Sequence, residues 1–251
     1  MVPIVGDVKN VLQQLIPNVK PARHDAWRGW LADMRRDHPS IAIPETDKIL
    51  PQYVIKKIYD LSGPDAYYAT GVGQHQMWAA QFIHFEEPNR WMTSGGLGTM
   101  GYGLPAAVGV QLAHPKSLVI DIAGEASVQM TMQELSTAVQ YRLPIKIFIL
   151  NNQYMGMVRQ WQELLHGNRY SESYSEALPD FVKLAEAMHA HGIRCKNPGD
   201  LDEAIKEMID IDKPVIFDCV VDQKENCFPM IPSGRAHNEM ILGDAAESLD
   251  E

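Results

Sequence analysis

Two apolar runs of strand length lie near the middle of the chain, at residues 118–123 and 145–150, and both are rich in Val and Ile. Runs of this length and composition are typical of fully buried strands in a parallel sheet. Between them, residues 131–142 carry Met132 and Leu135 and further apolar side chains at helical spacing. The pattern therefore predicts a strand, a crossover helix and a second strand parallel to the first.

Helical and strand patterns alternate along the rest of the chain after residue 50. The pattern predicts helices at 51–61, 77–83, 104–113, 156–165, 180–190 and 200–210, and strands at 66–70, 90–93, 193–195 and 215–221. Such alternation predicts an α/β fold in which helices flank both faces of a parallel sheet.

The first residues look separate from this pattern. Helical spacing is present at 8–15 and at 24–36, whereas residues 2–5 form a short apolar run that is either a leftover strand or a native edge strand. The prediction for the whole chain is an N-terminal remnant at 1–38, a linker at 39–50, a main domain at 51–228 and an irregular, partly disordered tail at 229–251.

Composition narrows the class of protein. With 251 residues, 45% hydrophobic and 22% charged, the chain is typical of a globular protein. Its net charge of −10 argues against nucleic-acid binding, and no window predicts a membrane span or a signal peptide. The three cysteines, Cys195, Cys219 and Cys227, form no metal-binding pair and are expected to be reduced thiols in a cytoplasmic protein.

The ends of the two central strands carry the first candidate chemistry. Glu125 follows the first strand, and Asn151 and Asn152 end the second. Parallel strands end at the same edge of their sheet, where α/β proteins bind ligands. A carboxylate and an amide oxygen brought together there suit Mg²⁺. The alternative is an acidic helix cap and an unrelated polar turn.

A second candidate lies in the turn 71–76, between a predicted strand and a helix. Exposed amides at the start of a helix attract anions, and Gln74 and His75 add hydrogen-bond donors. The alternative is a simple turn with polar capping residues, in which His75 is a surface histidine.

The glycine-rich segment offers a competing interpretation. Residues 96–101 satisfy the dinucleotide-binding pattern G-x-G-x-x-G, and Asp121 follows Gly101 by 20 residues. This would indicate an NAD-dependent oxidoreductase. However, the strand before the glycines is weak, Asp121 lies inside its strand, and Glu125 and Asn152 would have no role.

A family resemblance connects these motifs. Glu125 and the Asn pair, with 24 residues between Ala126 and Asn151, resemble the thiamine diphosphate motif Gly-Asp-Gly followed by Asn-Asn. The stretches 71–80, 94–105, 150–152 and 156–161 resemble the acetohydroxyacid synthase (acetolactate synthase) large catalytic subunit, in its C-terminal thiamine diphosphate-binding domain. In this sequence Glu125 replaces the usual aspartate, a change that keeps a carboxylate for Mg²⁺.

The resemblance implies a role for each site residue. Gln74 and His75 would hold the diphosphate with amides after Gly124, and Met100 would bend the cofactor beside Gly98. Cofactor contacts would come from Gly73, Gln74, His75, Gly98, Met100, Gly124, Glu125, Ala126, Ser127, Asn152, Tyr154 and Met157. Glu125, Asn152 and the Tyr154 carbonyl would bind Mg²⁺.

The same resemblance implies a substrate pocket formed by Met155, Val158 and Trp161, with Trp161 favouring 2-ketobutyrate as acceptor. The alternative for these residues is packing within an amphipathic helix. The implied reaction decarboxylates pyruvate and joins its hydroxyethyl unit to pyruvate or 2-ketobutyrate, early in valine, leucine and isoleucine synthesis. A bacterial, cytoplasmic enzyme is expected.

In the family, the activating glutamate belongs to an N-terminal pyrimidine-binding domain, and FAD is held by a middle domain. The resemblance implies that this chain lacks both, that residues 1–38 are the end of the middle domain, and that no catalytic residue lies within the chain. A homo-oligomer, or pairing with a chain that carries the N-terminal half, would complete the site, and a small regulatory subunit is a further expected partner. The alternative is a non-catalytic remnant that retains the cofactor site.

Overall fold

The computed structural model describes residues 2–39 and 41–243. Contacts group Ile43–Gly243 into one compact unit, and the residues up to Ala42 fall outside it. The N-terminal segment contains α1 (Val8–Leu15) and α2 (Asp25–Asp37), close to their predicted limits. The compact unit includes part of the predicted tail, whose last residues, 244–251, lie outside the described residues. The assignment of these segments to domains stays a prediction.

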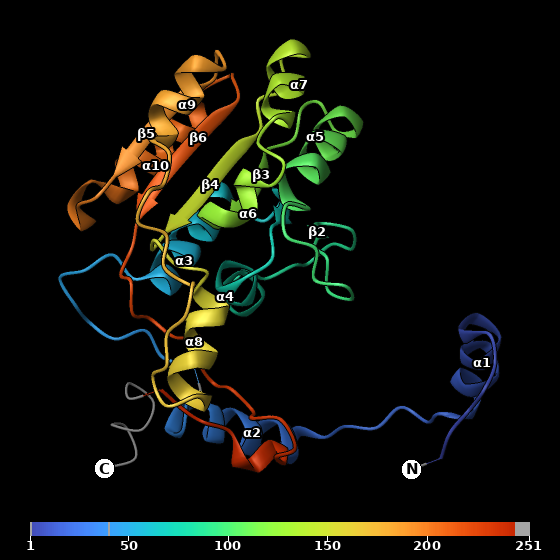
Figure 1. The fold of residues 1–251 in the computed structure, drawn as a ribbon. Coiled ribbons are helices and arrows are strands. Elements are labelled where there is room, and N and C mark those ends of the chain that lie inside the picture. The colour runs from blue at the N-terminus through green and yellow to red at the C-terminus, as the bar shows by residue number, and fades with distance from the viewer. Residues whose placement is uncertain (1, 40, 244–251) are drawn as a thin grey trace. The chain divides into compact units, whose positions relative to one another are not determined.

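Within the described residues, six parallel strands form one sheet in the order β2-β1-β3-β4-β6-β5 (Figure 1). The strands are β1 (Tyr67–Thr70), β2 (Trp91–Met92), β3 (Val119–Ala123), β4 (Lys146–Asn151), β5 (His191–Cys195) and β6 (Val215–Val220). The predicted α/β fold with a parallel sheet is confirmed.

Helices cover both faces of the sheet, as the alternating pattern predicts. One face packs against α3 (Pro51–Ser62), α4 (Gln74–Phe82) and α10 (Leu201–Asp210), and the other against α5 (Gly103–Ala113), α7 (Glu134–Gln140) and α9 (Phe181–Ala187). The remaining helices, α6 (Glu125–Gln129) and α8 (Gly156–Leu165), follow the carboxyl ends of β3 and β4.

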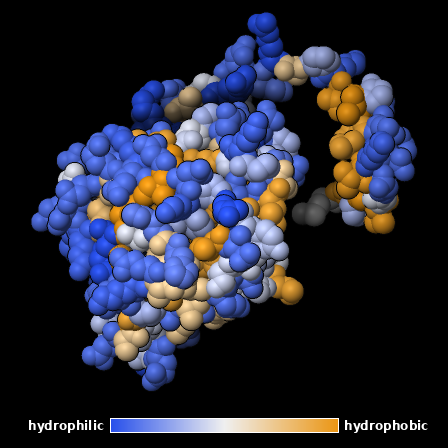
Figure 2. All heavy atoms as spheres, turned by 90° about the horizontal axis from the view of Figure 1, so that it is seen from above, coloured by the Kyte–Doolittle hydropathy of each residue, from blue (hydrophilic) through white to orange (hydrophobic). Residues whose placement is uncertain are grey.

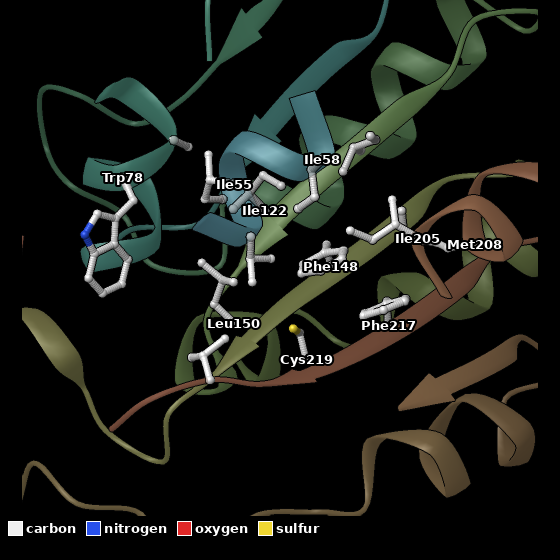
Figure 3. Close-up of a cluster of buried hydrophobic side chains, with 14 of the residues drawn as sticks. Ile55, Ile58, Trp78, Ile122, Phe148, Leu150, Ile205, Met208, Phe217 and Cys219 are labelled. Carbon is white, nitrogen blue, oxygen red and sulfur yellow. The ribbon is translucent and has the colours of Figure 1, made fainter. Parts of the chain in front are cut away.

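The central strands are apolar on both sides because both sides are buried. In β4, Phe148 contributes to one hydrophobic cluster, whereas Ile147 and Ile149 contribute to the cluster on the opposite face. Phe148 stacks on Phe217 of β6 with 4.5 Å between ring centroids, at the centre of the cluster in Figure 3. Burying one such side chain stabilises the fold by roughly 1.5–3 kcal/mol.

The predicted crossover helix at 131–142 is shorter in the structure, because a turn interrupts it. The helical part begins at Glu134, and the turn before it is held by the Thr131 hydroxyl, which donates to the Gly101 carbonyl at 2.8 Å. Within this turn the backbone bonds span three residues, as in the Glu134 N–H to the Thr131 carbonyl at 3.0 Å, in place of the four of an α-helix. The contact of the Thr131 hydroxyl also ties the glycine-rich segment to this connection.

The surface of the compact unit is more polar than its core. In the view of Figure 2 the compact unit is mostly hydrophilic with scattered hydrophobic side chains, whereas the N-terminal segment carries a continuous row of hydrophobic side chains. Among the described residues, no helix combines the length and the apolar character that crossing a membrane requires.

The carboxyl group of Asp121 lies inside the sheet. Asp121 is in the middle of β3, opposite Ala69 and Ile147 of the neighbouring strands, and is 1% exposed. Its Oδ1 has no hydrogen-bond partner, and a Cβ placed on Gly103 would lie 2.0 Å from that oxygen. Burial raises the pKa of Asp121 to about 8. The folded state therefore holds this side chain in its neutral form at pH 7.

This burial predicts a pH-dependent stability. Between the ordinary pKa of 3.8 and the raised value of about 8, the folded protein binds a proton that the unfolded chain releases. Stability therefore falls as pH rises through this window, by up to about 1.4 kcal/mol per pH unit from this group. Asp121→Asn removes the titrating group. In urea unfolding, the free energy of unfolding of the variant should therefore rise relative to that of the wild type from pH 5 to pH 8.

Asp60→Asn is the matched control, because the Asp60 side chain is 44% exposed on α3. Its stability relative to the wild type should change little over the same range. A constant difference between Asp121→Asn and the wild type across this range would contradict the assignment of a neutral Asp121.

Candidate functional site

The strand order creates a crevice at the carboxyl edge of the sheet. From β1 the chain passes to β2 on one side and then to β3 on the other, so the order reverses between β1 and β3. Open α/β sheets bind ligands at such a switch point. Gly71 follows β1 and Gly124 follows β3 at this edge.

The structure brings together the two halves of the predicted cation site. Because β3 and β4 are neighbouring parallel strands, Glu125 and Asn152 both lie at their carboxyl ends. The Glu125 carboxylate accepts the Gln153 backbone N–H, and the Asn152 Oδ1 accepts the Tyr154 N–H at 3.0 Å. The alternative interpretation, an acidic helix start at Glu125 and a polar turn at Asn152, fits each residue taken alone. The two residues nevertheless line the same cavity.

Burial controls the charge of Glu125. The side chain is 3% exposed, and this burial raises its pKa to about 7, although hydrogen bonds from backbone amides act in the opposite direction. A buried carboxylate with so high a pKa is poorly compensated by its surroundings. A cation placed beside it would favour its ionised form.

His75 and Gln74 belong to a helix, not to the turn that the sequence predicts. Helix α4 begins at Gln74, so both side chains project from its first turn, and they are 7% and 3% exposed respectively. The interpretation of His75 as a surface histidine is therefore wrong. Burial lowers the pKa of His75 to about 4, which keeps the ring neutral at pH 7, and its Nε2 has no partner.

Glycines let these side chains lie against the backbone. A Cβ on Gly71 would lie 2.2 Å from the Ser127 Oγ, and a Cβ on Gly124 would lie 2.8 Å from the His75 Nδ1. Ser127 also accepts the Gly101 N–H at 2.9 Å, which fixes the glycine-rich segment beside the site. The glycines therefore provide room for polar side chains at a crowded strand edge.

A cavity of about 170 Å³ unites the predicted residues. All twelve predicted cofactor contacts line it, together with Met155 and Val158 of the predicted substrate pocket. Trp161 does not line it; it lines an adjacent pocket with Met157, Val158, Gln162, His166 and Arg169. The prediction omitted four lining residues, Val72, Trp78, Leu150 and Gly156. Three of them could have been predicted from their position: Val72 precedes Gly73, Gly156 lies between Met155 and Met157, and Leu150 ends the predicted strand.

The dinucleotide interpretation has no support in this geometry. The fingerprint glycines precede α5, which begins at Gly103, and Gly96 is not at the start of a helix. An acid that binds ribose lies at the carboxyl end of its strand, whereas Asp121 is buried in the middle of β3.

The donor set fits a hard cation. Among the described residues there is no group of three or more His, Cys, Asp or Glu side chains that could hold a metal. A cation here would instead use the Glu125 carboxylate, the Asn152 amide oxygen and a backbone carbonyl at Tyr154, with phosphate and water completing its shell. The loop that carries Tyr154 is held by a bridge to Tyr174.

The packing around Gly156 yields a test by mutation. A Cβ there would lie 2.0 Å from the Gln74 Oε1, and that side chain is held by hydrogen bonds to Gln160 and to the Glu225 carbonyl. Gly156→Ala should therefore destabilise the fold by about 1–3 kcal/mol in thermal or urea unfolding.

The matched control is Gly109→Ala in α5, where an added Cβ meets nothing within 4 Å. Alanine in such a helix should be neutral or stabilise by up to about 1 kcal/mol. Equal stability of the two variants would show that Gln74 does not occupy this space.

Comparison with known proteins agrees with the site. The profile of the thiamine pyrophosphate enzyme C-terminal TPP binding domain matches residues 71–219. The chain is 44% identical over 247 residues to the acetolactate synthase large subunit of Cyanidium caldarium, covering 95% of this chain and 42% of that protein. It is 42% identical to the acetolactate synthase large subunit of Haemophilus influenzae, covering 99% of this chain and 45% of that protein.

A solved structure shares the fold. The thiamine diphosphate-dependent 4-hydroxybenzoylformate decarboxylase of Rhodococcus jostii RHA1 superposes with a TM-score of 0.67 and 26% identity, covering 74% of this chain and 35% of that one. The chain thus spans less than half the length of these relatives. It belongs to the thiamine pyrophosphate enzyme family, as a C-terminal TPP binding domain, and its sequence is similar to acetolactate synthase large subunits.

Proposed function

We propose that this chain binds thiamine diphosphate and Mg²⁺ in the cavity at the carboxyl edge and forms part of an acetolactate synthase active site. The observation that carries the proposal is the convergence of His75, Glu125 and Asn152 in one cavity of a thiamine pyrophosphate enzyme domain. The similarity to acetolactate synthase large subunits supports the reaction class.

In this proposal, Glu125, Asn152 and the Tyr154 carbonyl hold Mg²⁺. Two features support the fit: Glu125 is a buried carboxylate without a cationic partner among the described residues, and His75 has an unpaired Nε2 in the same cavity. His75 is proposed to donate to the diphosphate, along with backbone amides at the start of α6, which follows Gly124.

The other lining residues are proposed to orient the cofactor and keep its reactive end dry. Gly98 and Met100 line the cavity and are proposed to face the pyrimidine ring, and Gly73, Ala126 and Ser127, which line it too, are proposed to face the diphosphate. Met155, Met157 and Val158 give the wall an apolar section. An apolar wall excludes water that would otherwise protonate a reactive carbon.

Thiamine diphosphate, when bound, supplies a carbon nucleophile and an electron sink that let a 2-keto acid lose carbon dioxide. The proposed substrates are pyruvate as donor and pyruvate or 2-ketobutyrate as acceptor, in branched-chain amino-acid synthesis. Trp161 lines a pocket that shares Met157 and Val158 with the cofactor cavity, which supports a role in receiving the acceptor.

Another polypeptide segment is proposed to supply the activating glutamate. Among the residues that line the cavity, the one carboxylate is Glu125, which the proposal already assigns to Mg²⁺. A homo-oligomer or a chain with the pyrimidine-binding domain would complete the site, and a small regulatory subunit remains a proposed partner. The three cysteines are free and buried, which supports the proposed cytoplasmic location.

Cofactor binding is tested by calorimetric titration of the chain with thiamine diphosphate, with Mg²⁺ and with a chelator. Binding should require Mg²⁺, and Glu125→Gln should weaken it by more than about tenfold, because the substitution removes the one carboxylate charge among the lining residues. Glu203→Gln on α10 is the matched control, because the Glu203 side chain is 80% exposed, and it should bind as the wild type does. Absence of binding by the wild type under all conditions would refute the proposed function.

Catalysis is tested separately, by measuring acetolactate formed from pyruvate. We expect no turnover by the chain alone and turnover when a protein carrying the pyrimidine-binding half of a related synthase is added. Cofactor binding without turnover in that mixture would favour the alternative, a cofactor-binding domain without catalytic function.

A further inference from the structure

Asn151, the last residue of β4, lies on the opposite face of the sheet from the cofactor cavity. Leu150 and Asn152 line the cavity, whereas Ile149 belongs to the hydrophobic cluster on the other face. Successive side chains of a strand point to opposite faces, so Asn151 shares the face of Ile149. A contact that holds the Asn151 side chain on that face therefore also sets the direction of Asn152 on the cavity side.

The carboxylate of Asp218 provides this contact. Asp218 lies in β6 opposite Ile149 and is 2% exposed. The Asn151 Nδ2 donates to its Oδ1 at 2.8 Å, and the Nε of Arg194 in β5 donates to its Oδ2 at 2.8 Å. Because an ionised carboxylate only accepts, these bonds determine which way the Asn151 amide faces. Each oxygen of Asp218 thus holds a different neighbour.

Arg194 also reaches the second support of the loop that follows β4. Its Nη2 donates to the Asp180 Oδ1 at 2.6 Å, and Asp180 caps the start of α9. The segment before α9 pairs with the loop, since the Met155 N–H donates to the Ser173 carbonyl at 2.8 Å. Arg194 therefore connects the contact at the end of β4 with the segment that holds the far side of the loop.

The loop requires support because its backbone is strained at Gln153. This residue has a φ of 61°, in the left-handed region that favours glycine, and its N–H donates to the Glu125 carboxylate. Such a conformation persists only where the surrounding structure imposes it. The supports at Asn151 and Met155 lie on either side of Gln153, so they are placed to impose the conformation that connects the loop to Glu125.

Stability alone does not account for this network. The Asn151 Oδ1 is buried without a hydrogen-bond partner among the described residues, and an ion pair that buries a carboxylate often adds little net stability. Burial is the main cause of the raised pKa of Glu125, and the negative charge of Asp218 raises it further. A bound cation would reduce the repulsion between these two carboxylates. Both the geometry and the charge of Asp218 therefore act on the proposed cation site.

We propose that Asp218, paired with Arg194, is a positioning residue for the cation site. Through Asn151 it keeps Asn152 directed at the cavity, and the rigidity of this arrangement makes the site select Mg²⁺ over larger cations. The inference rests on the proposed function, which assigns Asn152 to the cation. Mg²⁺ requires near-ideal octahedral geometry, whereas Ca²⁺ accepts flexible geometry at longer distances. A loosened loop therefore weakens the binding of Mg²⁺ more than that of Ca²⁺.

The experiment is calorimetric titration of the chain with Mg²⁺ and, separately, with Ca²⁺, at a fixed, saturating concentration of thiamine diphosphate. Asp218→Asn keeps the shape of the side chain but leaves one oxygen for two neighbours. It should raise the Kd of Mg²⁺ by about tenfold and that of Ca²⁺ by less than about threefold. Arg194→Lys covers the case in which Asp218→Asn does not fold, because the Arg194 side chain is 31% exposed. A lysine cannot span both carboxylates, so this variant should shift the two Kd values in the same way.

Asp202→Asn is the matched control. Asp202 pairs with Lys57 at 2.8 Å between α10 and α3, and neither residue lines the cavity, so both Kd values should stay at those of the wild type. If the Asp218 and Arg194 variants keep both Kd values, or weaken the two cations equally, the inference fails and the proposed function stands. If the wild type binds neither cation, the proposed function fails and the inference fails with it.

Hydrogen exchange of the chain without ligand, followed by NMR, tests the positioning itself. The Tyr154 N–H donates to the Asn152 Oδ1 at 3.0 Å, so its exchange reports whether Asn152 keeps its direction. Exchange at Tyr154 should be faster in Asp218→Asn and Arg194→Lys than in the wild type and in Asp202→Asn, while exchange at Phe148 in the middle of β4 stays unchanged. Equal exchange at Tyr154 in all four proteins would overturn the inference, even if the cation affinities differ.

Discussion

The site depends on one constraint, the parallel pairing of β3 with β4. Parallel strands end at the same edge, so Glu125 and Asn152 meet although they are distant in sequence. The pairing is secured by hydrophobic packing on both faces, with Phe148 on one face and Ile147 and Ile149 on the other. A one-residue slip in register would move each β4 side chain to the opposite face of the sheet and disrupt the packing of both hydrophobic clusters, so the core that stabilises the sheet also fixes the site.

Burial gives the site its electrostatic character. The neutral state of His75 and the raised pKa of Glu125 have the same cause, which is the loss of solvation at a crowded strand edge. Without a ligand, the polar and ionisable groups of this site lack interaction partners. A ligand that carries both positive and negative charge would supply them. A magnesium diphosphate would provide a cation for Glu125 and an anion for His75.

The pattern of apolar and polar residues predicted those elements whose conformation depends mainly on their own sequence. The buried strands β3 and β4 are apolar runs, and their edge could be placed without the structure. The start of α4 could not, because the residues at 71–76 are typical of a turn and tertiary burial of Gln74 and His75 overrides that preference. The interruption before α7 was missed because Thr131 bonds a carbonyl 30 residues away.

Long-range contacts also explain what the family resemblance did not supply. Gln160 has no motif of its own, and its partner Cys227 lies 67 residues further along the chain. The family resemblance groups Trp161 with Met155, but the two side chains line different pockets, Met155 just before α8 and Trp161 within it. The contact of Gln160 depends on how α8 and the segment after β6 pack together, which spacing along the chain does not encode.

Hydrogen–deuterium exchange of the chain with and without magnesium thiamine diphosphate tests the central claim most directly, that the carboxyl edge binds this ligand. Slower exchange is expected at residues 71–76, 124–127 and 152–157, which border the cavity, and unchanged exchange is expected in α10. Unchanged exchange at these three segments, or protection confined to other parts of the chain, would contradict the account.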